Sequence, residues 1–308
     1  MSWLVFAFSG PVLWAISVHF DKYLVERFFK ESNVAVLVVF TAFTGVLMLP
    51  FIWFFDRAVF SVDAETIAII AASGVLYMGA MLFYLQALQS EEASVVAPFF
   101  QTSPLFGYVL AYFALGEKLS AMQMAGGMLI VVGASVVSIR FAPANGEGKR
   151  GSAFKLRLAL LMLACGFVLA LATLIFKIFA IEVAFWTTAF WMFAGEAIFG
   201  AALLTVASYR NQLVALIRSN SAALLSINAS NELINLGGGL GNRYALLLAP
   251  LSLVQAIGST TTLFVFAFGI VISIAWPKLS RESLSGRELT QKGIAAALVA
   301  LGVALVTR

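Results

Sequence analysis

The stretch SAALLSINASNELINLGGGLGN, Ser221–Asn242, carries a continuous row of polar side chains within a segment of membrane-spanning length. At 100° per residue these side chains fall on one narrow face of a helix, and the face comprises Asn228, Asn231, Glu232, Asn235 and Asn242. The GGGLG run at residues 237–241 lets another helix or a bound molecule come close to the backbone. The stretch therefore predicts a membrane helix with one polar face, and we interpret the rest of the chain around it.

The composition of the chain excludes an ordinary soluble domain. Hydrophobic residues make up 62% and charged residues only 11%, whereas soluble domains carry about 25% charged residues. Apolar runs of about twenty residues recur along the whole length, and each is long enough for a spanning helix. The start, MSWL, has no basic region or cleavage pattern of a signal peptide, so we expect the first span to be retained. The sequence predicts an all-α integral membrane protein.

Ten spans are predicted from apolar length, turn residues and charge clusters. They cover residues 3–21, 33–55, 65–88, 93–114, 120–140, 156–177, 184–207, 221–246, 251–274 and 289–307. The longest polar and flexible stretch, PANGEGKRGS at residues 143–152, separates the first five spans from the last five. We therefore expect a first five-helix repeat over 1–142, a polar linker over 143–155 and a second five-helix repeat over 156–308.

The two halves of the chain align with each other. A shift of 158 residues lays Tyr77 over Asn235, Tyr84 over Asn242, and Gln101 over Ser259. Because each half has an odd number of spans, the second half enters the membrane from the opposite side. This predicts ten transmembrane helices arranged as two inverted repeats, which are common among secondary transporters.

The fourth and fifth predicted spans resemble a known family more clearly than the rest of the chain does. The residues that carry the resemblance to an EamA-type repeat are ASVVAP at 93–98, Pro104-Leu105, LGEKLS at 115–120, Gln123, Gly126, Leu129-Ile130 and Gly133. The chain is thus similar to ten-span members of the drug/metabolite transporter superfamily, although in the second half Thr262 replaces the proline and a longer basic loop replaces the Gly-Glu-Lys turn. The resemblance implies a transporter scaffold in a bacterial inner membrane, and such scaffolds host many substrates.

The distribution of basic residues predicts the orientation. Fourteen of the nineteen Lys and Arg residues are counted in loops after odd-numbered spans, with Arg210 and Arg218 among them, and Arg243 is counted on the opposite side. The positive-inside rule then puts the odd loops in the cytoplasm and both termini outside. The family resemblance favours the opposite orientation, since ten-span relatives are generally drawn with both termini cytoplasmic. Our prediction follows the charge count.

Polar residues inside the spans are the candidate binding site. A polar side chain facing lipid costs several kcal/mol, so we expect these side chains to face one another or a watery cavity between the halves. The candidate substrate-binding residues are Trp14, Ser17, Tyr77, Tyr84, Gln101, Asn228, Asn231, Glu232, Asn235, Gln255, Ser259 and Thr262. The alternative for any one of them is a hydrogen bond between neighbouring helices, worth roughly 0.6 kcal/mol.

Two acids within the spans, Glu232 and Glu196, are candidates for proton coupling. A carboxylate at mid-membrane must be paired, hydrated or protonated, so Glu232 is expected to stay protonated, bind a cationic group or carry a proton. Glu196 shares its face with small and apolar residues and is either part of the site or structural. Lys177, at the end of a span, is expected to extend to the membrane surface, and Glu117 is expected in a solvated turn.

Function classes are narrowed by what the sequence contains. It has one histidine, one cysteine and no catalytic motif, which argues against an enzyme, a metal site or a bound cofactor. Rings of like charge and filter sequences are missing, which argues against a channel. We predict a transporter, more readily an exporter, of an amino acid or organic cation. A phosphate-bearing substrate is less suited, because the spans contain no arginine cluster that would bind it. The alternative is a flippase for a lipid or lipid-linked sugar. The expected partners are the substrate and the bilayer, without nucleic acid; a monomer suffices and an oligomer is compatible.

Overall fold

Helices form the regular structure of the computed structural model, which describes residues 2–27, 34–90, 102–138, 152–275 and 286–306. The first half contains α1 Ser2–Arg27, α2 Val34–Thr44, the 3-10 helix η1 Gly45–Leu47, α3 Met48–Phe55, the 3-10 helix η2 Arg57–Phe60, α4 Ala64–Ser90, α6 Ser103–Leu115 and α7 Ala121–Ser138. The second half contains α8 Ser152–Glu182, α9 Phe185–Thr205, α10 Ala207–Leu248, α11 Leu251–Gly258, α12 Thr261–Ala275 and α13 Gly286–Val306. Over these residues no strand occurs, and the all-α class is confirmed.

Two of the predicted spans each consist of two successive α-helices. Between α2 and α3 the backbone tightens into η1, because Pro50 has no N–H to donate and its ring would clash with the carbonyl four residues before it. The helix α11 begins directly after Pro250 and gives way to α12 at a run of hydroxyl residues. There Ser259, Thr260 and Thr261 donate to carbonyls one turn earlier, which competes with regular helix bonding.

The polar helix α10 is longer than the span predicted at 221–246. It runs without interruption for 42 residues from Ala207 to Leu248. Arg210 and Arg218, which the charge count treats as loop residues, lie inside this helix. The segment before residue 221 contains neither proline nor glycine, so nothing in its sequence ends the helix there.

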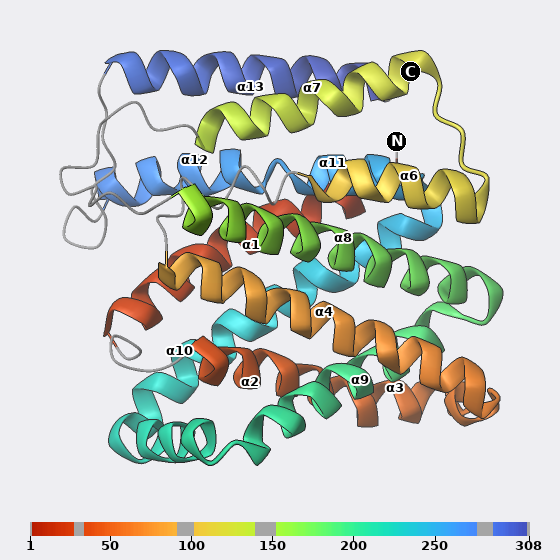
Figure 1. The fold of residues 1–308 in the computed structure, drawn as a ribbon, viewed down its shortest axis with the longest axis vertical. Coiled ribbons are helices and arrows are strands. Elements are labelled where there is room, and N and C mark those ends of the chain that lie inside the picture. The colour runs from red at the N-terminus through yellow and green to blue at the C-terminus, as the bar shows by residue number, and fades with distance from the viewer. Residues whose placement is uncertain (1, 28–33, 91–101, 139–151, 276–285, 307–308) are drawn as a thin grey trace.

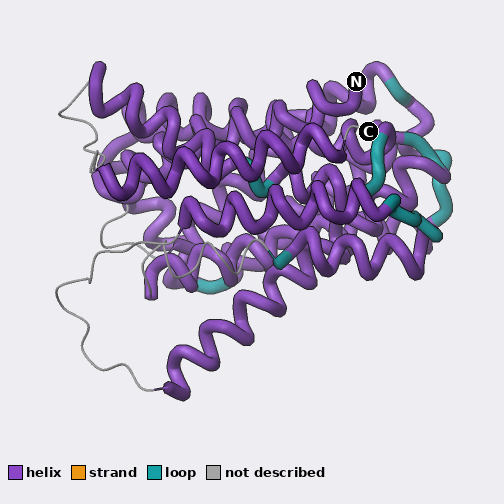
Figure 2. Tube along the Cα trace, turned by 90° about the horizontal axis from the view of Figure 1, so that it is seen from above, coloured by secondary structure: helices purple, strands orange, loops and turns teal. Residues whose placement is uncertain are grey.

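The helices pack side by side in a bundle (Figure 1). The pair α7 and α13 lies at one edge, α2, α3 and α9 lie at the opposite edge, and α1, α4 and α8 lie between them, while α10 runs obliquely from the α2–α9 edge toward α11. Glycines permit the closest approaches: Gly126 meets the backbone of Gly302 where α7 crosses α13, and Gly195 meets the carbonyl of Ala71 where α9 crosses α4. The N- and C-terminal ends lie on the same side of the bundle in both views (Figures 1 and 2).

Several helices are suited to cross a membrane. Six described segments are long and apolar enough: residues 3–20, 35–55, 64–86, 160–182, 185–205 and 251–272; three shorter apolar helices lie at 103–115, 121–136 and 290–306. The polar helix α10 is not among them. Large apolar side chains also face outward, with Phe54, Phe55 and Phe113 at 67%, 71% and 80% exposure. A surface of this kind suits lipid rather than water.

Candidate functional site

The polar face of α10 turns into the bundle at its middle. Glu232 is 4% exposed, and its Oε1 accepts a hydrogen bond of 2.9 Å from Thr41 Oγ1 on α2. Asn228 and Asn231 are buried beside it, and Asn235 is partly buried. The helical period seen in the sequence therefore does place these side chains on the inward side of one helix.

Some buried oxygens on α1 and α10 have no hydrogen-bond partner among the described residues. They are Oδ1 of Asn228, Oδ1 of Asn242 and Oγ of Ser17. A buried polar atom without a partner costs about 1–3 kcal/mol, so native proteins normally supply water or a ligand at such positions. These three atoms therefore have unused capacity to accept a hydrogen bond.

The packing of α1 on α10 brings the first predicted span to the polar helix. Gly10 approaches Asn242, and Gly238 approaches the Trp14 indole, so the two helices run antiparallel. One helical turn beyond Trp14 on α1, and one turn back along α10, Ser17 comes level with Asn235. The glycine run at the end of the polar stretch therefore serves close packing at Gly238, whereas a side chain at Gly239 would meet no atom within 4 Å.

A second buried acid, Glu196 on α9, forms an ion pair with Arg243 on α10. The distance from Arg243 Nη2 to Glu196 Oε1 is 2.7 Å, and their side chains are only 12% and 6% exposed. The guanidinium also lies over three aromatic rings, at 5.6 Å from the centroids of Tyr77 and Phe176 and 4.9 Å from that of Phe193. Glu196 is thus held by an opposite charge, and Arg243 is part of the bundle interior rather than of a loop.

Tyr77 lies in the neighbourhood of both acids. Its ring centroid is 5.6 Å from the Arg243 guanidinium, and Glu196 and Glu232 are close enough for their charges to be felt at the Tyr77 ring. Tyr77 lies on α4, more than a hundred residues before Glu196 on α9 and Glu232 on α10. We use the term acidic centre for Tyr77, Glu196, Glu232 and Arg243 together with Thr41.

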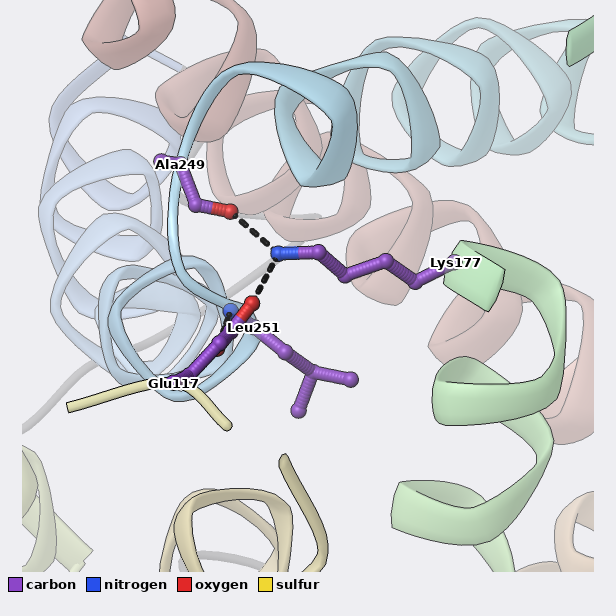
Figure 3. A network of polar contacts seen from close by, with 4 residues as sticks. All are labelled: Glu117, Lys177, Ala249 and Leu251. Carbon is purple, nitrogen blue, oxygen red and sulfur yellow. Dashed lines mark hydrogen bonds and ion pairs between the residues drawn. The ribbon is translucent and has the colours of Figure 1, made fainter. Parts of the chain in front are cut away.

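A different buried ion pair joins α8 to the turn after α6 (Figure 3). Lys177 Nζ on α8 pairs with Glu117 in the turn after α6 and donates to the Ala249 carbonyl at 2.7 Å. The second carboxylate oxygen of Glu117 accepts the Leu251 N–H at 2.9 Å. We call these four residues the clasp. The predictions of a membrane-surface lysine and a solvated Glu117 are wrong, because the α10–α11 turn folds over both side chains and supplies backbone partners to each.

The ninth-span residues point away from the acidic centre. Gln255 packs against Gly107 of α6, Thr262 Oγ1 donates to the Ala134 carbonyl of α7 at 3.4 Å, and Ser259 bonds its own helix. Tyr84 packs at the interface of α4 with α8. Gln101 lies outside the described residues. The predicted set is therefore divided between the acidic centre, the α1–α10 contact and the packing of α11 and α12 on α6 and α7.

The sequence analysis gave four residues no part in the polar interior of the bundle: Thr41, Arg243, Glu117 and Lys177. A signal existed for Arg243, because it lies eleven residues after Glu232, which is about three helical turns and nearly the same face. A threonine within an apolar run, such as Thr41, gives a weaker signal. Within the described residues, no three His, Cys, Asp or Glu side chains gather as metal ligands would.

The helices and their apolar surfaces define an integral membrane protein. Residues 1–139 match the model of the EamA-like transporter family, which confirms the resemblance over these residues. This family indicates a membrane transporter of the drug/metabolite type, a class that is generally not enzymatic. No curated protein matches the sequence. A solved structure described only as "Crystal structure of protein" is similar with a TM-score of 0.68 and 17% identity over 99% of this chain and 96% of that chain, a likeness of fold alone.

Proposed function

We propose that this protein is a secondary transporter of a small polar or amphipathic metabolite, such as an amino acid or an organic cation. Two five-span halves, residues 1–142 and 156–308 on either side of the 143–155 linker, alternate access to a site between them. The substrate lies against the polar face of α10, and export is the expected direction. The protein acts in a bacterial inner membrane with both termini outside the cytoplasm.

The packing of helix pairs supports the inverted repeat. In an inverted repeat of five spans, α1 of the first half corresponds to α8 of the second, and α10 of the second half corresponds to α4 of the first. The pairs α1–α10 and α8–α4 are therefore equivalent, and both are in contact. The helices α7 and α13 are the last spans of the two halves and are equivalent to each other. They pack together and run antiparallel, as Gly126 beside Gly302 and Gly133 beside Ala295 indicate. An even number of crossings also agrees with chain ends on one side of the bundle. Counting ten spans requires α10 and the three shorter apolar helices to cross as well.

The burial of Glu232 within the bundle is the observation that carries the proposal. A carboxyl group that is 4% exposed within a membrane bundle, close to two amides and a threonine hydroxyl, is expensive to keep without a function. The carboxyl group of Glu232 is able to bind the ammonium group of a substrate or to carry a transported proton. The ring of Tyr77 adds a face that attracts cations.

The test begins by finding a ligand for the purified protein. A ligand that binds only the folded state raises the melting temperature, so amino acids and quaternary amines are screened for this effect. The best ligand is then loaded into reconstituted vesicles, and its flux is measured between pH 6 and pH 8. We expect Glu232→Gln to reduce flux at least tenfold and to remove its pH dependence while the protein inserts and purifies normally.

Glu65→Gln is the matched control, because Glu65 is an exposed acid in the first turn of α4. It should transport as the unaltered protein does. Unchanged flux and pH dependence in Glu232→Gln would remove Glu232 from the mechanism. Stabilisation by none of the amino acids or amines would overturn the substrate class.

The alternative is a flippase for a lipid or lipid-linked sugar, and the groove of about 650 Å³ between α12 and α13 bears on it. A lipid headgroup needs a polar path to cross the membrane, whereas this groove is lined almost wholly by apolar side chains. The groove by itself therefore does not supply the path that a flippase needs.

A further inference from the structure

Arg243 on α10 has hydrogen-bonding capacity that its ion pair leaves unused. A guanidinium carries five N–H donors in one plane. Among the residues that the structure describes, Arg243 makes one side-chain hydrogen bond, from Nη2 to Glu196 Oε1 at 2.7 Å. The pair is therefore held by a single N–H···O bond and not by the two parallel bonds that a guanidinium and a carboxylate are able to form.

The surroundings of Arg243 do not supply acceptors for the remaining donors. The side chain is mostly buried, and its guanidinium lies over the rings of Tyr77, Phe176 and Phe193. Aromatic faces attract the positive charge but are only weak hydrogen-bond acceptors. Buried donors are normally paired with protein, water or a ligand, because an unpaired donor is costly. The unused edge of Arg243 is therefore a position at which we expect a bound acceptor.

A carboxylate fits these donors better than the other charged groups of small metabolites do. It is planar and offers two acceptor oxygens, which match the fork of N–H groups on a guanidinium. An organic cation brings no acceptor for them and is repelled by the positive charge of Arg243. A phosphate group carries about two negative charges, whereas Arg243 has one positive charge that Glu196 already offsets.

We propose that the substrate is an amino acid, and that Arg243 determines this specificity by binding the substrate carboxylate with its unused N–H donors. The inference rests on the proposed function and narrows its substrate class. Glu196 and Arg243 together are neutral, so a bound carboxylate adds a negative charge to the interior of the bundle. The ammonium group of an amino acid balances that charge, whereas a plain carboxylic acid has no group that does so.

The experiment compares ligands that differ only in the carboxylate. Each standard amino acid that raises the melting temperature of the purified protein is measured beside its carboxamide and its decarboxylated amine, by equilibrium binding in a neutral detergent. The amino acid should bind about tenfold more tightly than either derivative. Amines that bind as tightly as the amino acids, or that bind when no amino acid does, would overturn this inference and leave the proposed transport of organic cations intact. Binding of no amino acid and no amine would overturn both.

Single variants of the ion pair separate carboxylate binding from a structural role. Arg243→Gln should weaken binding of the amino acid about tenfold and leave binding of its carboxamide unchanged, so the preference between them disappears. Glu196→Gln should tighten binding of the amino acid about threefold, because the carboxylate then meets a positive charge that nothing offsets. A structural pair would instead weaken binding of the amino acid and the carboxamide alike in both variants, and that result would overturn the proposal.

The double variant Glu196→Gln/Arg243→Gln provides the test if a single variant does not fold, because it leaves neither charge of the pair buried without its partner. It should bind the amino acid and the carboxamide equally, and a retained preference for the amino acid would overturn the proposal. Arg57→Gln is the matched control, since Arg57 also lies over an aromatic ring, that of Trp53 at 4.5 Å, but is exposed. It should keep the preference of the unaltered protein.

Discussion

Two buried ion pairs in the described part of the chain, Glu117–Lys177 and Glu196–Arg243, differ in their surroundings. In the clasp, the remaining bonding capacity is taken up by backbone groups, the Ala249 carbonyl and the Leu251 N–H. These groups belong to the backbone of the turn between α10 and α11. The clasp therefore has one arrangement that satisfies its charges.

The second pair is surrounded by aromatic rings instead. Arg243 lies over Tyr77, Phe176 and Phe193, and these rings give a guanidinium no second strong acceptor to compete with Glu196. Under the proposed function, a substrate carboxylate or a proton on Glu196 would change this pair without breaking backbone bonds. The comparison teaches that backbone partners fix a buried charge in place, whereas ring partners leave it able to exchange.

The largest effect is expected when the clasp loses one charge. Lys177→Met leaves Glu117 buried and charged, which should lower stability by about 3–5 kcal/mol. The melting temperature in detergent measures it. Combining Lys177→Met with Glu117→Gln should recover part of the loss, and a double variant no more stable than Lys177→Met would contradict the pairing.

A smaller loss is expected from crowding the helix that carries Glu196. In Gly195→Ala the added methyl group meets the Ala71 carbonyl, so α9 and α4 must separate at a cost of about 1–3 kcal/mol. Gly239→Ala is the matched control, because a Cβ there meets nothing within 4 Å, and it should be neutral or slightly stabilising. Equal melting temperatures for the two variants would mean that the close α4–α9 crossing is absent.

Replacing Arg243 by lysine should affect transport more than stability. Lysine keeps the charge but loses the planar group that lies over three rings, so flux of the ligand found above should fall about tenfold. The melting temperature should fall less than in Lys177→Met. Arg57→Lys is the control, since Arg57 lies over the exposed Trp53 ring at 4.5 Å. Normal transport by Arg243→Lys would place this pair with the clasp as a structural contact.

The smallest effect is expected at Asp63, an exposed residue before α4. The Thr66 N–H donates to its carboxylate at 2.9 Å, and this hydrogen bond lowers the pKa of Asp63. A lowered folded-state pKa contributes stability above the unfolded pKa of about 3.9, and that stability is lost as the pH falls through the folded value. Asp63→Ala should therefore melt slightly earlier than the unaltered protein at pH 7, with a gap that narrows toward pH 3. A gap that widens in acid would contradict this sign.

The fold class and the polar face of α10 were predictable from the sequence, because both follow from local repetition. Apolar runs of spanning length mark membrane helices, and the spacing of Asn228, Asn231 and Glu232 defines one helical face whatever surrounds it. The EamA-like motifs are also short and contiguous, so they were recognisable before any packing was known.

Which polar groups meet was decided only by the tertiary structure. Glu196 and Arg243 are 47 residues apart, Glu117 and Lys177 are 60 apart, and Thr41 and Glu232 are 191 apart. Periodicity describes the side of one helix, but it carries no information on which helix that side faces or how closely glycines let it approach. For this reason the same analysis that placed Glu232 inside the bundle also placed Lys177 at the membrane surface, where packing does not put it.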